Sequence, residues 1–300
     1  MIKIAFSEKY HHPLPENHRF PMAKYSLIPQ QLIYEGAFTR QHFFIPRELD
    51  PDIIAAVHDD TYIHKLNNGT LERKEERRIG FPWSESLIRR EEHITAGTLQ
   101  AAEYALENGI AFNVAGGTHH AYRDRGEGFC IYNDIAVAAQ YLLDRGIVRQ
   151  VLVVDLDVHQ GNGTAKIFEQ EPRVFTFSMH GAKNYPLHKE KSDLDIALSA
   201  DVTDKEYLDL LQKNLAHLVE TVKPDFIFFQ SGVDILENDR LGKLSISKAG
   251  IRERDKIVLE NAYHRNIPVA ASMGGGYARH IRNIVDAHCN TYRIARDLWE

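Results

Sequence analysis

Residues 151–163 read VLVVDLDVHQGNG, an apolar run that carries two aspartates and a histidine. Side chains alternate between the two faces of a strand, so Asp155, Asp157 and His159 would share one face and apolar side chains the other. Buried carboxylates destabilise a fold unless they are paired with a cation or bind a metal. The stretch therefore predicts a buried strand that ends in a functional site.

Further short apolar runs, typical of strands buried on both faces, occur at 2–6, 110–115, 173–179, 225–231 and 267–272. Helical patterns separate them at 86–108, 133–145 and 247–264. One more helix begins at a capping box formed by Thr203 and Glu206 and ends before Pro224. Alternating strands and helices predict a single α/β domain over residues 1–300, with three α/β/α layers around a mainly parallel central sheet.

The composition is that of a globular protein with a mildly acidic surface. The chain has 36 Lys and Arg against 42 Asp and Glu, a net charge of −6, so we expect no direct nucleic-acid partner. Its 2 cysteines imply no disulfide framework. No apolar run suits a signal peptide or a membrane span, so we expect a soluble cytoplasmic protein, or a nuclear one in a eukaryote. The charged run at 71–78 and the pair His11–His12 are expected at the surface.

Three residues near the ends of predicted strands carry the side chains of a metal site. Asp157 and His159 belong to the stretch quoted above, and Asp234 follows the strand at 225–231. In parallel α/β sheets, functional sites form beyond the carboxyl ends of the strands. Two carboxylates and one imidazole suit a divalent cation with positions left for water and substrate.

Two other strand ends carry groups suited to acid–base chemistry. His119 and His120 follow a glycine pair, which lets the chain turn and aim both imidazoles inward. Asp155 is the carboxylate expected to orient one of them. Tyr277 follows three glycines, and its hydroxyl is placed to donate a hydrogen bond to a developing oxyanion.

Two rival motifs fit less well. The segment GNGTAK at 161–166 resembles a dinucleotide-binding fingerprint, but Lys166 stands where the third glycine belongs. The segment VVDLDV at 153–158 resembles the strand end of aspartate-nucleophile phosphatases, but His159 stands where those enzymes have Thr or Val. The phosphatase interpretation leaves the histidine pair and Tyr277 without a role, so it ranks a distant second.

The combined motifs resemble the histone deacetylase superfamily of the arginase/deacetylase fold, and more closely its class IV-like and bacterial members. Six segments match in the family's order and span nearly the whole chain. They are HRFPMAKY (18–25), GGTHHAYRDRGEGFCIYNDIAVAA (116–139), DLDVHQGNGT (155–164), FSMH (177–180), GVDILENDRLGKLSIS (232–247) and MGGGY (273–277).

The resemblance implies bound ions. Asp157, His159 and Asp234 match the zinc ligands of the family, and an oxygen-rich ligand set also accepts Fe²⁺ or Co²⁺. Members of the family hold a structural potassium ion near the zinc. Here Asp155, Asp157 and Ser178, with backbone carbonyls, match its ligands.

The resemblance also implies catalytic roles. His119 and His120 match the tandem histidines, with His120 expected to transfer protons and His119 to act electrostatically. Asp155 matches the carboxylate that orients the first histidine, and Tyr277 matches the tyrosine that polarises the acyl carbonyl. Asn162 stands where class I members have Asp as partner of His120; the alternative is that Asn162 caps the following helix. Substrate-binding positions match Gly128, Phe129, Cys130 and Gly275.

The activity implied is zinc-dependent hydrolysis of an amide that links an acetyl or longer acyl group to a lysine side chain. The substrate would be an acyl-lysine protein or peptide. Two alternatives remain open: deacylation of a small amine such as an acetylpolyamine, and a binding protein that has lost activity on this fold.

Overall fold

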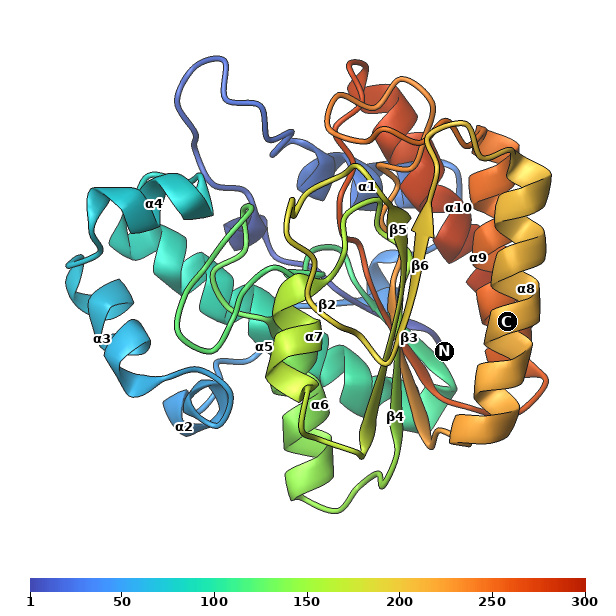
Figure 1. Cartoon of the computed structure of the whole chain (residues 1–300), viewed down its shortest axis with the longest axis horizontal. Coiled ribbons are helices and arrows are strands. Elements are labelled where there is room, and N and C mark those ends of the chain that lie inside the picture. Colours follow the sequence, from blue (N-terminus) through green and yellow to red (C-terminus); the bar gives the residue numbers. More distant parts are fainter.

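One sheet of eight parallel strands forms the centre of the computed structural model, which describes residues 1–300 (Figure 1). The strand order is β2-β1-β3-β8-β7-β4-β5-β6. The strands are β1 (Lys3–Ala5), β2 (Phe43–Phe44), β3 (Ile110–Asn113), β4 (Val151–Asp155), β5 (Val174–Gly181), β6 (Leu194–Leu198), β7 (Phe226–Gln230) and β8 (Val269–Ser272).

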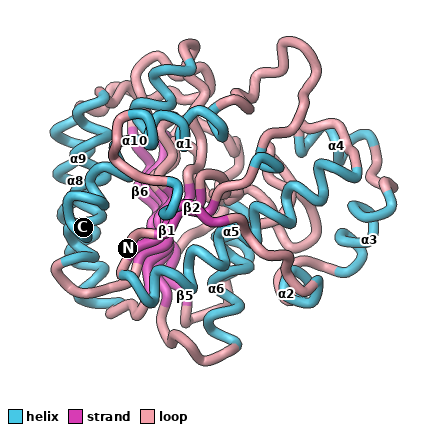
Figure 2. Tube along the Cα trace, turned by 180° about the vertical axis from the view of Figure 1, so that it is seen from behind, coloured by secondary structure: helices cyan, strands magenta, loops and turns pink.

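Helices cover both faces of this sheet, which confirms the predicted three-layer α/β/α fold (Figures 1 and 2). On one face lie α1 (Lys24–Tyr34), α8 (Asp204–Val222), α9 (Lys248–Tyr263) and α10 (Ile281–Trp299). On the other lie α5 (Glu85–Asn108), α6 (Asp134–Asp144) and α7 (Asn162–Phe168). The short helices α2 (Pro51–Ala55), α3 (Asp60–Asn68) and α4 (Arg73–Ile79) lie beyond α5, away from the sheet.

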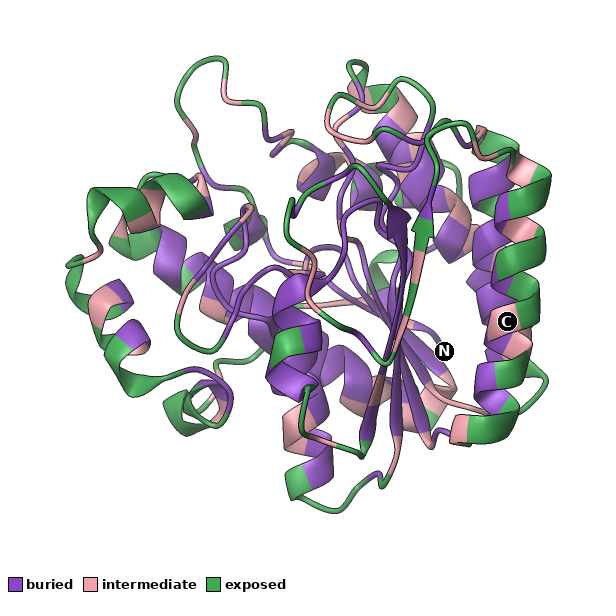
Figure 3. Ribbon diagram, in the orientation of Figure 1, coloured by how far each residue is buried: buried purple, intermediate pink, exposed green.

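Strand β4 shows why a continuous apolar run forms here. Val151 and Val153 pack into the hydrophobic cluster under α5 and α6, whereas Leu152 and Val154 pack into the larger cluster under α8, α9 and α10. All four side chains are buried because helices cover both faces of the strand (Figure 3). The run is therefore apolar at every position, as expected for a parallel sheet between two helical layers.

The sequence predicts a strand over residues 151–157, and this extent was wrong. Strand β4 ends at Asp155, and the residues that follow form a bend. The Asp155 carboxylate accepts a hydrogen bond from the Asp157 amide (3.2 Å), and the Asp157 carboxylate accepts one from the His159 amide (3.0 Å). These side-chain acceptors bond amides that a longer strand would pair with its neighbour. A turn, and not strand alternation, brings Asp157 and His159 together.

The main predicted helices are confirmed within one or two residues as α5, α6 and α9, and the capping box Thr203–Glu206 begins α8. The run at 71–78 lies largely in the solvated helix α4, as expected. The surface prediction was wrong for His12, which is buried, although His11 is exposed. No helix of the structure has both the length and the apolar composition needed to span a bilayer.

A buried arginine connects the two strand ends that carry the candidate metal ligands. Arg254 in α9 donates hydrogen bonds to the carbonyls of Leu156, which follows β4, and of Ser231 and Gly232, which follow β7. Its charge is balanced by Asp255 at 2.7 Å, and neither side chain is exposed to solvent.

We predict that Arg254→Met lowers the free energy of unfolding by about 3–5 kcal/mol, because it leaves the Asp255 carboxylate buried and unpaired. The measurement is denaturant-induced unfolding. The control is Arg265→Met, which removes an ion pair with Glu220 at the surface and should change stability by less than about 1 kcal/mol. Equal effects of the two substitutions would contradict this account.

Candidate functional site

The predicted site residues follow four strands that are neighbours in the sheet. Strands β3, β8, β7 and β4 lie side by side, and their carboxyl ends meet at one edge. The histidine pair follows β3, Tyr277 follows β8, Asp234 follows β7 and Asp157 follows β4. The parallel topology alone therefore gathers residues from across the sequence, as in other α/β proteins.

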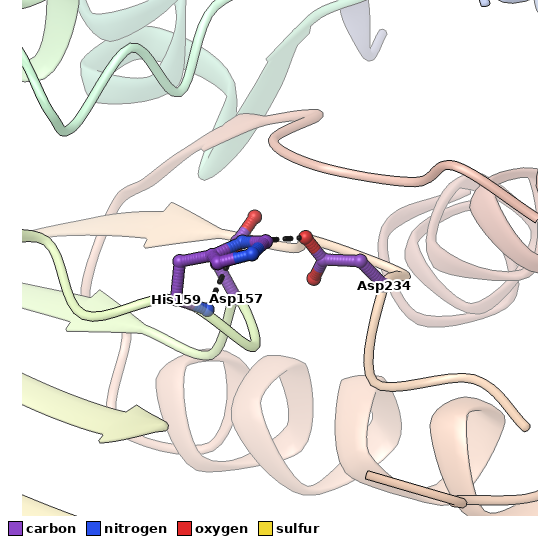
Figure 4. A group of neighbouring side chains, drawn as sticks. All are labelled: Asp157, His159 and Asp234. Carbon is purple, nitrogen blue, oxygen red and sulfur yellow. Dashed lines mark hydrogen bonds and ion pairs between the residues drawn. The ribbon is translucent and has the colours of Figure 1, made fainter. Parts of the chain in front are cut away.

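Asp157, His159 and Asp234 form a compact buried group (Figure 4). One donor atom from each lies within 4.8 Å of the others. The His159 Nδ1 atom is 3.0 Å from Asp157 Oδ1 and 3.1 Å from Asp234 Oδ2. Backbone amides hold the outer oxygens: Gly275 donates to Asp157 Oδ2 (2.7 Å) and Val158 donates to Asp234 Oδ1 (2.9 Å).

The charge of this group suits a bound cation. Neither Asp157 nor Asp234 forms an ion pair with a lysine or arginine, and Asp234 Oδ2 is buried without a well-formed hydrogen bond. Burial lowers the pKa of His159, but the two carboxylates outweigh burial and raise it to about 10. Burial and repulsion from Asp157 raise the pKa of Asp234. The group favours a positive charge at its centre, and two oxygens with one nitrogen fit a divalent metal ion.

Two glycines turn the chain so that His119 and His120 lie side by side. Gly116 and Gly117 have φ of +78° and +74°, a region that favours glycine. The two imidazole rings are 4.1 Å apart between centroids. His119 Nδ1 lies 2.7 Å from Asp155 Oδ2, as the sequence suggests. Burial lowers the pKa of His119, but the charges of Asp155 and Asp157 give a net upward shift.

His120 lies in a different environment. Its Nδ1 atom is 2.6 Å from Asn162 Oδ1. Burial, together with the neighbouring His119 and His159, holds the pKa of His120 well below its usual value, so the ring is neutral. The helix-cap alternative for Asn162 was wrong, because Gly161 is the N-cap of α7 and the Asn162 side chain bonds His120 instead.

Aromatic rings form the wall of a narrow cavity beside these groups. The Phe129 ring is 5.3 Å from Phe20 and 6.1 Å from Tyr277, between centroids. Gly128 has φ of +53°, and a Cβ there would lie 2.7 Å from His120 Cδ2, so a side chain would collide with the imidazole. The cavity has a volume of about 40 Å³ and is also lined by Cys130 and by both histidines.

Tyr277 lies at this cavity with a free hydroxyl. The backbone amide of Tyr277 donates to Asp239 Oδ2 (2.6 Å), which fixes the residue after the glycine turn. Burial raises the pKa of Tyr277 well above 10, and Asp157 and Asp234 add to the shift, so the phenol keeps its proton. It is a hydrogen-bond donor at the cavity wall.

Several residues around the cavity were not predicted from the sequence. The Tyr185 ring lies 5.0 Å from the His120 ring, and its hydroxyl donates to Glu127 (2.5 Å). Lys24 is buried behind Tyr277, and its Nζ donates to the Gly274 carbonyl (3.0 Å). Tyr185 lies in an irregular loop with no local pattern. Lys24 lies inside the segment 18–25 and is buried in α1 together with Tyr25 and Ile28. The available signal was a charged residue beside these apolar positions.

The dinucleotide interpretation of 161–166 does not fit the structure. In such sites glycines let a bound pyrophosphate approach the backbone. Gly163 instead lies against protein, because a Cβ there would be 2.2 Å from the Ala121 carbonyl oxygen.

The family model described as the histone deacetylase domain matches residues 18–292. The chain belongs to the histone deacetylase family. It is 43% identical over 296 residues, 99% of both chains, to an uncharacterized protein of Picosynechococcus sp.. It is 29% identical over 304 residues to histone deacetylase 2 of Arabidopsis thaliana, covering 95% of this chain and 76% of the relative.

A solved structure agrees on the fold of this histone deacetylase family member. The crystal structure of an HDAC homolog complexed with SAHA superposes with a TM-score of 0.86 at 24% identity. The match covers 99% of this chain and 84% of the other.

We predict that Asp157→Asn and His159→Ala each strip divalent metal from the protein, because three protein ligands leave little redundancy. Metal content after dialysis, measured by elemental analysis, tests this. Asp209→Asn is the control, since Asp209 lies exposed on α8 and should leave the metal content unchanged. Full metal content in the Asp157 and His159 variants would place the metal elsewhere.

Proposed function

We propose that the protein is a zinc-dependent deacetylase that hydrolyses the amide of acetylated lysine side chains. The observation that carries this proposal is the juxtaposition of a neutral histidine, His120, with Asp157 and His159 in one narrow, aromatic-walled cavity, where these two residues form a buried group with Asp234. Membership in the histone deacetylase family supports it.

The three residues of the buried group would hold the zinc ion, which supplies a Lewis acid that polarises the amide and acidifies water. His120 is neutral and faces the cavity, so it accepts the proton of the attacking water and later gives it to the leaving amine. The Tyr277 hydroxyl donates a hydrogen bond to the oxyanion that develops on the amide oxygen. The carboxylates of Asp155 and Asp157 raise the pKa of His119, so His119 is the histidine of the pair that more readily carries a positive charge in the cavity.

The residues around the cavity favour lysine over a polyamine. Phe129 and Tyr277 offer apolar surface for the methylene groups of a lysine side chain. The charged neighbours of Phe129 include Arg19, whose guanidinium lies 5.1 Å from the ring. Glu127 is already bonded to Arg125 and Tyr185. Glu127 is therefore not free to pair with the second ammonium group of a polyamine.

The volume favours a short acyl group. The cavity is small, with a volume of about 40 Å³. An octanoyl group is much longer than an acetyl group, so it requires that the walls move further apart.

The phosphatase interpretation has less support. Its nucleophile would be Asp155, whose Oδ2 is 2.7 Å from His119 Nδ1 and whose Oδ1 accepts the Asp157 amide. Both carboxylate oxygens of Asp155 are therefore already hydrogen-bonded, and neither is free to act as a nucleophile.

The substrate is tested with a panel of acetyl-lysine peptide, octanoyl-lysine peptide and acetylspermidine, with release of the free amine as the readout. We expect the acetyl-lysine peptide to give the highest kcat/KM, and His120→Ala to lose activity on all three. A higher kcat/KM for acetylspermidine would replace the lysine assignment by the small-amine one. Hydrolysis of none of them by metal-loaded protein would contradict the deacetylase proposal.

We predict that Tyr277→Phe lowers kcat by about 10²–10³, the range for loss of one oxyanion donor. Metal content should stay unchanged, because Tyr277 is not a member of the group Asp157, His159 and Asp234. A loss of less than about threefold would remove Tyr277 from the mechanism.

We predict that Asn162→Asp moves the acidic limb of kcat/KM to higher pH. Burial first, and then the neighbouring imidazoles, keep the pKa of His120 low, and a negative charge at its Nδ1 would raise that pKa. The neutral ring is the form that accepts a proton, so the rate falls at a higher pH than in the wild type. The comparison is repeated with cobalt, because water acidified by the metal is an alternative origin of the limb. A limb that stays in place with both metals would contradict the role of Asn162.

A further inference from the structure

A chain of three hydrogen bonds runs outward from the proposed catalytic base. His120 Nδ1 lies 2.6 Å from Asn162 Oδ1, Asn162 Nδ2 donates to the Tyr122 hydroxyl (2.9 Å), and that hydroxyl donates to Glu190 Oε1 (3.1 Å). His120, Asn162 and Tyr122 are buried, and Glu190 is partly exposed. Neither Tyr122 nor Glu190 belongs to the cavity wall, and the mechanism above does not use them.

The direction of each hydrogen bond follows from the outermost member. The Glu190 carboxylate only accepts, so the single proton of the Tyr122 hydroxyl is donated to it. The Tyr122 oxygen then accepts from the NH₂ end of the Asn162 amide, which leaves the carbonyl end of that amide facing His120. A carbonyl oxygen only accepts, so His120 carries its proton on Nδ1. The Nε2 atom is left unprotonated, as a general base requires.

Several contacts hold this chain in place. Glu190 exchanges two hydrogen bonds with the Gln160 side chain, through its carbonyl (2.7 Å) and its amide (2.9 Å). The Arg125 guanidinium lies 3.6 Å from the Tyr122 ring centroid. Burial, with the charge of Glu190, raises the pKa of Tyr122, so its hydroxyl stays protonated. The backbone of Glu190 and the ring of Tyr122 are thus both fixed.

We propose that Tyr122 and Glu190 are positioning residues that lock the Asn162 amide and so hold His120 in the Nδ1–H tautomer. The proposal rests on the proposed function for the role of His120 as base. An aspartate at position 162 would need no such lock, because both of its oxygens accept. An amide turned end for end would donate to Nδ1 and force the proton onto Nε2, where it blocks catalysis. The neutral partner of His120 therefore requires a second residue to fix its orientation.

The tautomer is measured directly by ¹⁵N NMR of the imidazole in metal-free protein, with His120→Ala used to assign the signals. We expect one tautomer in the wild type, protonated on Nδ1, and a mixture of the two in Tyr122→Phe. Because one ordinary hydrogen bond biases an equilibrium by roughly two- to tenfold, its loss should turn a single tautomer into a mixture and lower kcat/KM by about twofold, as the productive fraction falls towards one half. Tyr141→Phe is the control, since that hydroxyl bonds Glu103 far from the site and its loss should change neither readout.

A double-substitution experiment separates positioning from a general structural effect. In an Asn162→Asp background, Tyr122→Phe should leave kcat/KM unchanged, because the aspartate cannot present a donor. An equal loss in both backgrounds, or a single Nδ1–H tautomer retained in Tyr122→Phe, would overturn the proposal. If the wild type hydrolyses no acyl-lysine but Tyr122→Phe still changes the tautomer, the proposed function is refuted and the role of Tyr122 in orienting the Asn162 amide stands.

Discussion

The buried negative charge of Asp157 and Asp234 is the constraint on which the rest of the site depends. Their side chains are 2% and 0% exposed, and imidazoles are their only ion-pair partners. Two such carboxylates repel each other unless a cation or hydrogen-bond donors compensate them. The structure supplies donors from the backbone at Gly275 and Val158 and one imidazole between the carboxylates. The remaining negative charge of the two carboxylates favours a bound cation, and a divalent metal ion would balance it.

The two carboxylates can lie close together because glycine backbone packs directly against them. A Cβ at Gly232 would lie 2.4 Å from Asp157 Oδ2, and one at Gly275 would lie 2.1 Å from Asp234 Oδ2. Side chains at these positions would displace the carboxylates. Arg254 holds the two strand ends from the opposite side through their carbonyls. The site is therefore built from backbone positions fixed by the sheet, and its chemistry needs only a few side chains.

The sequence predicts the part of this site that follows from parallel topology. The α/β alternation predicts a parallel sheet with the carboxyl ends of its strands at one edge, and Asp157, His159 and Asp234 come together there because β4 and β7 are neighbours. It does not predict where β4 ends, because side-chain acceptors after Asp155 compete with the sheet ladder. The short strand β2 and the partly exposed edge strand β6 lack the apolar run that marks the buried strands.

Long-range partnerships are also invisible in the sequence. Tyr122 and Glu190 are 68 residues apart, and each alone reads as an ordinary residue of a loop. The same holds for Tyr185, whose ring reaches His120 from the loop after β5. Strand periodicity places residues at a sheet edge, but the irregular loops beyond that edge decide which of them meet. The role of the Asn162 amide can be inferred only once its two hydrogen-bond partners, His120 and Tyr122, are known.

The central claim is that the buried Asp–His–Asp group binds one zinc ion and that this ion enables amide hydrolysis. The most direct measurement is a titration of metal-free protein with zinc, with acetate release from an acetyl-lysine peptide recorded at each addition. The account predicts no activity without metal and a rate that rises in proportion to zinc and levels off at one equivalent per chain. Full activity in the presence of a chelator, or none after one equivalent of zinc has bound, would contradict it.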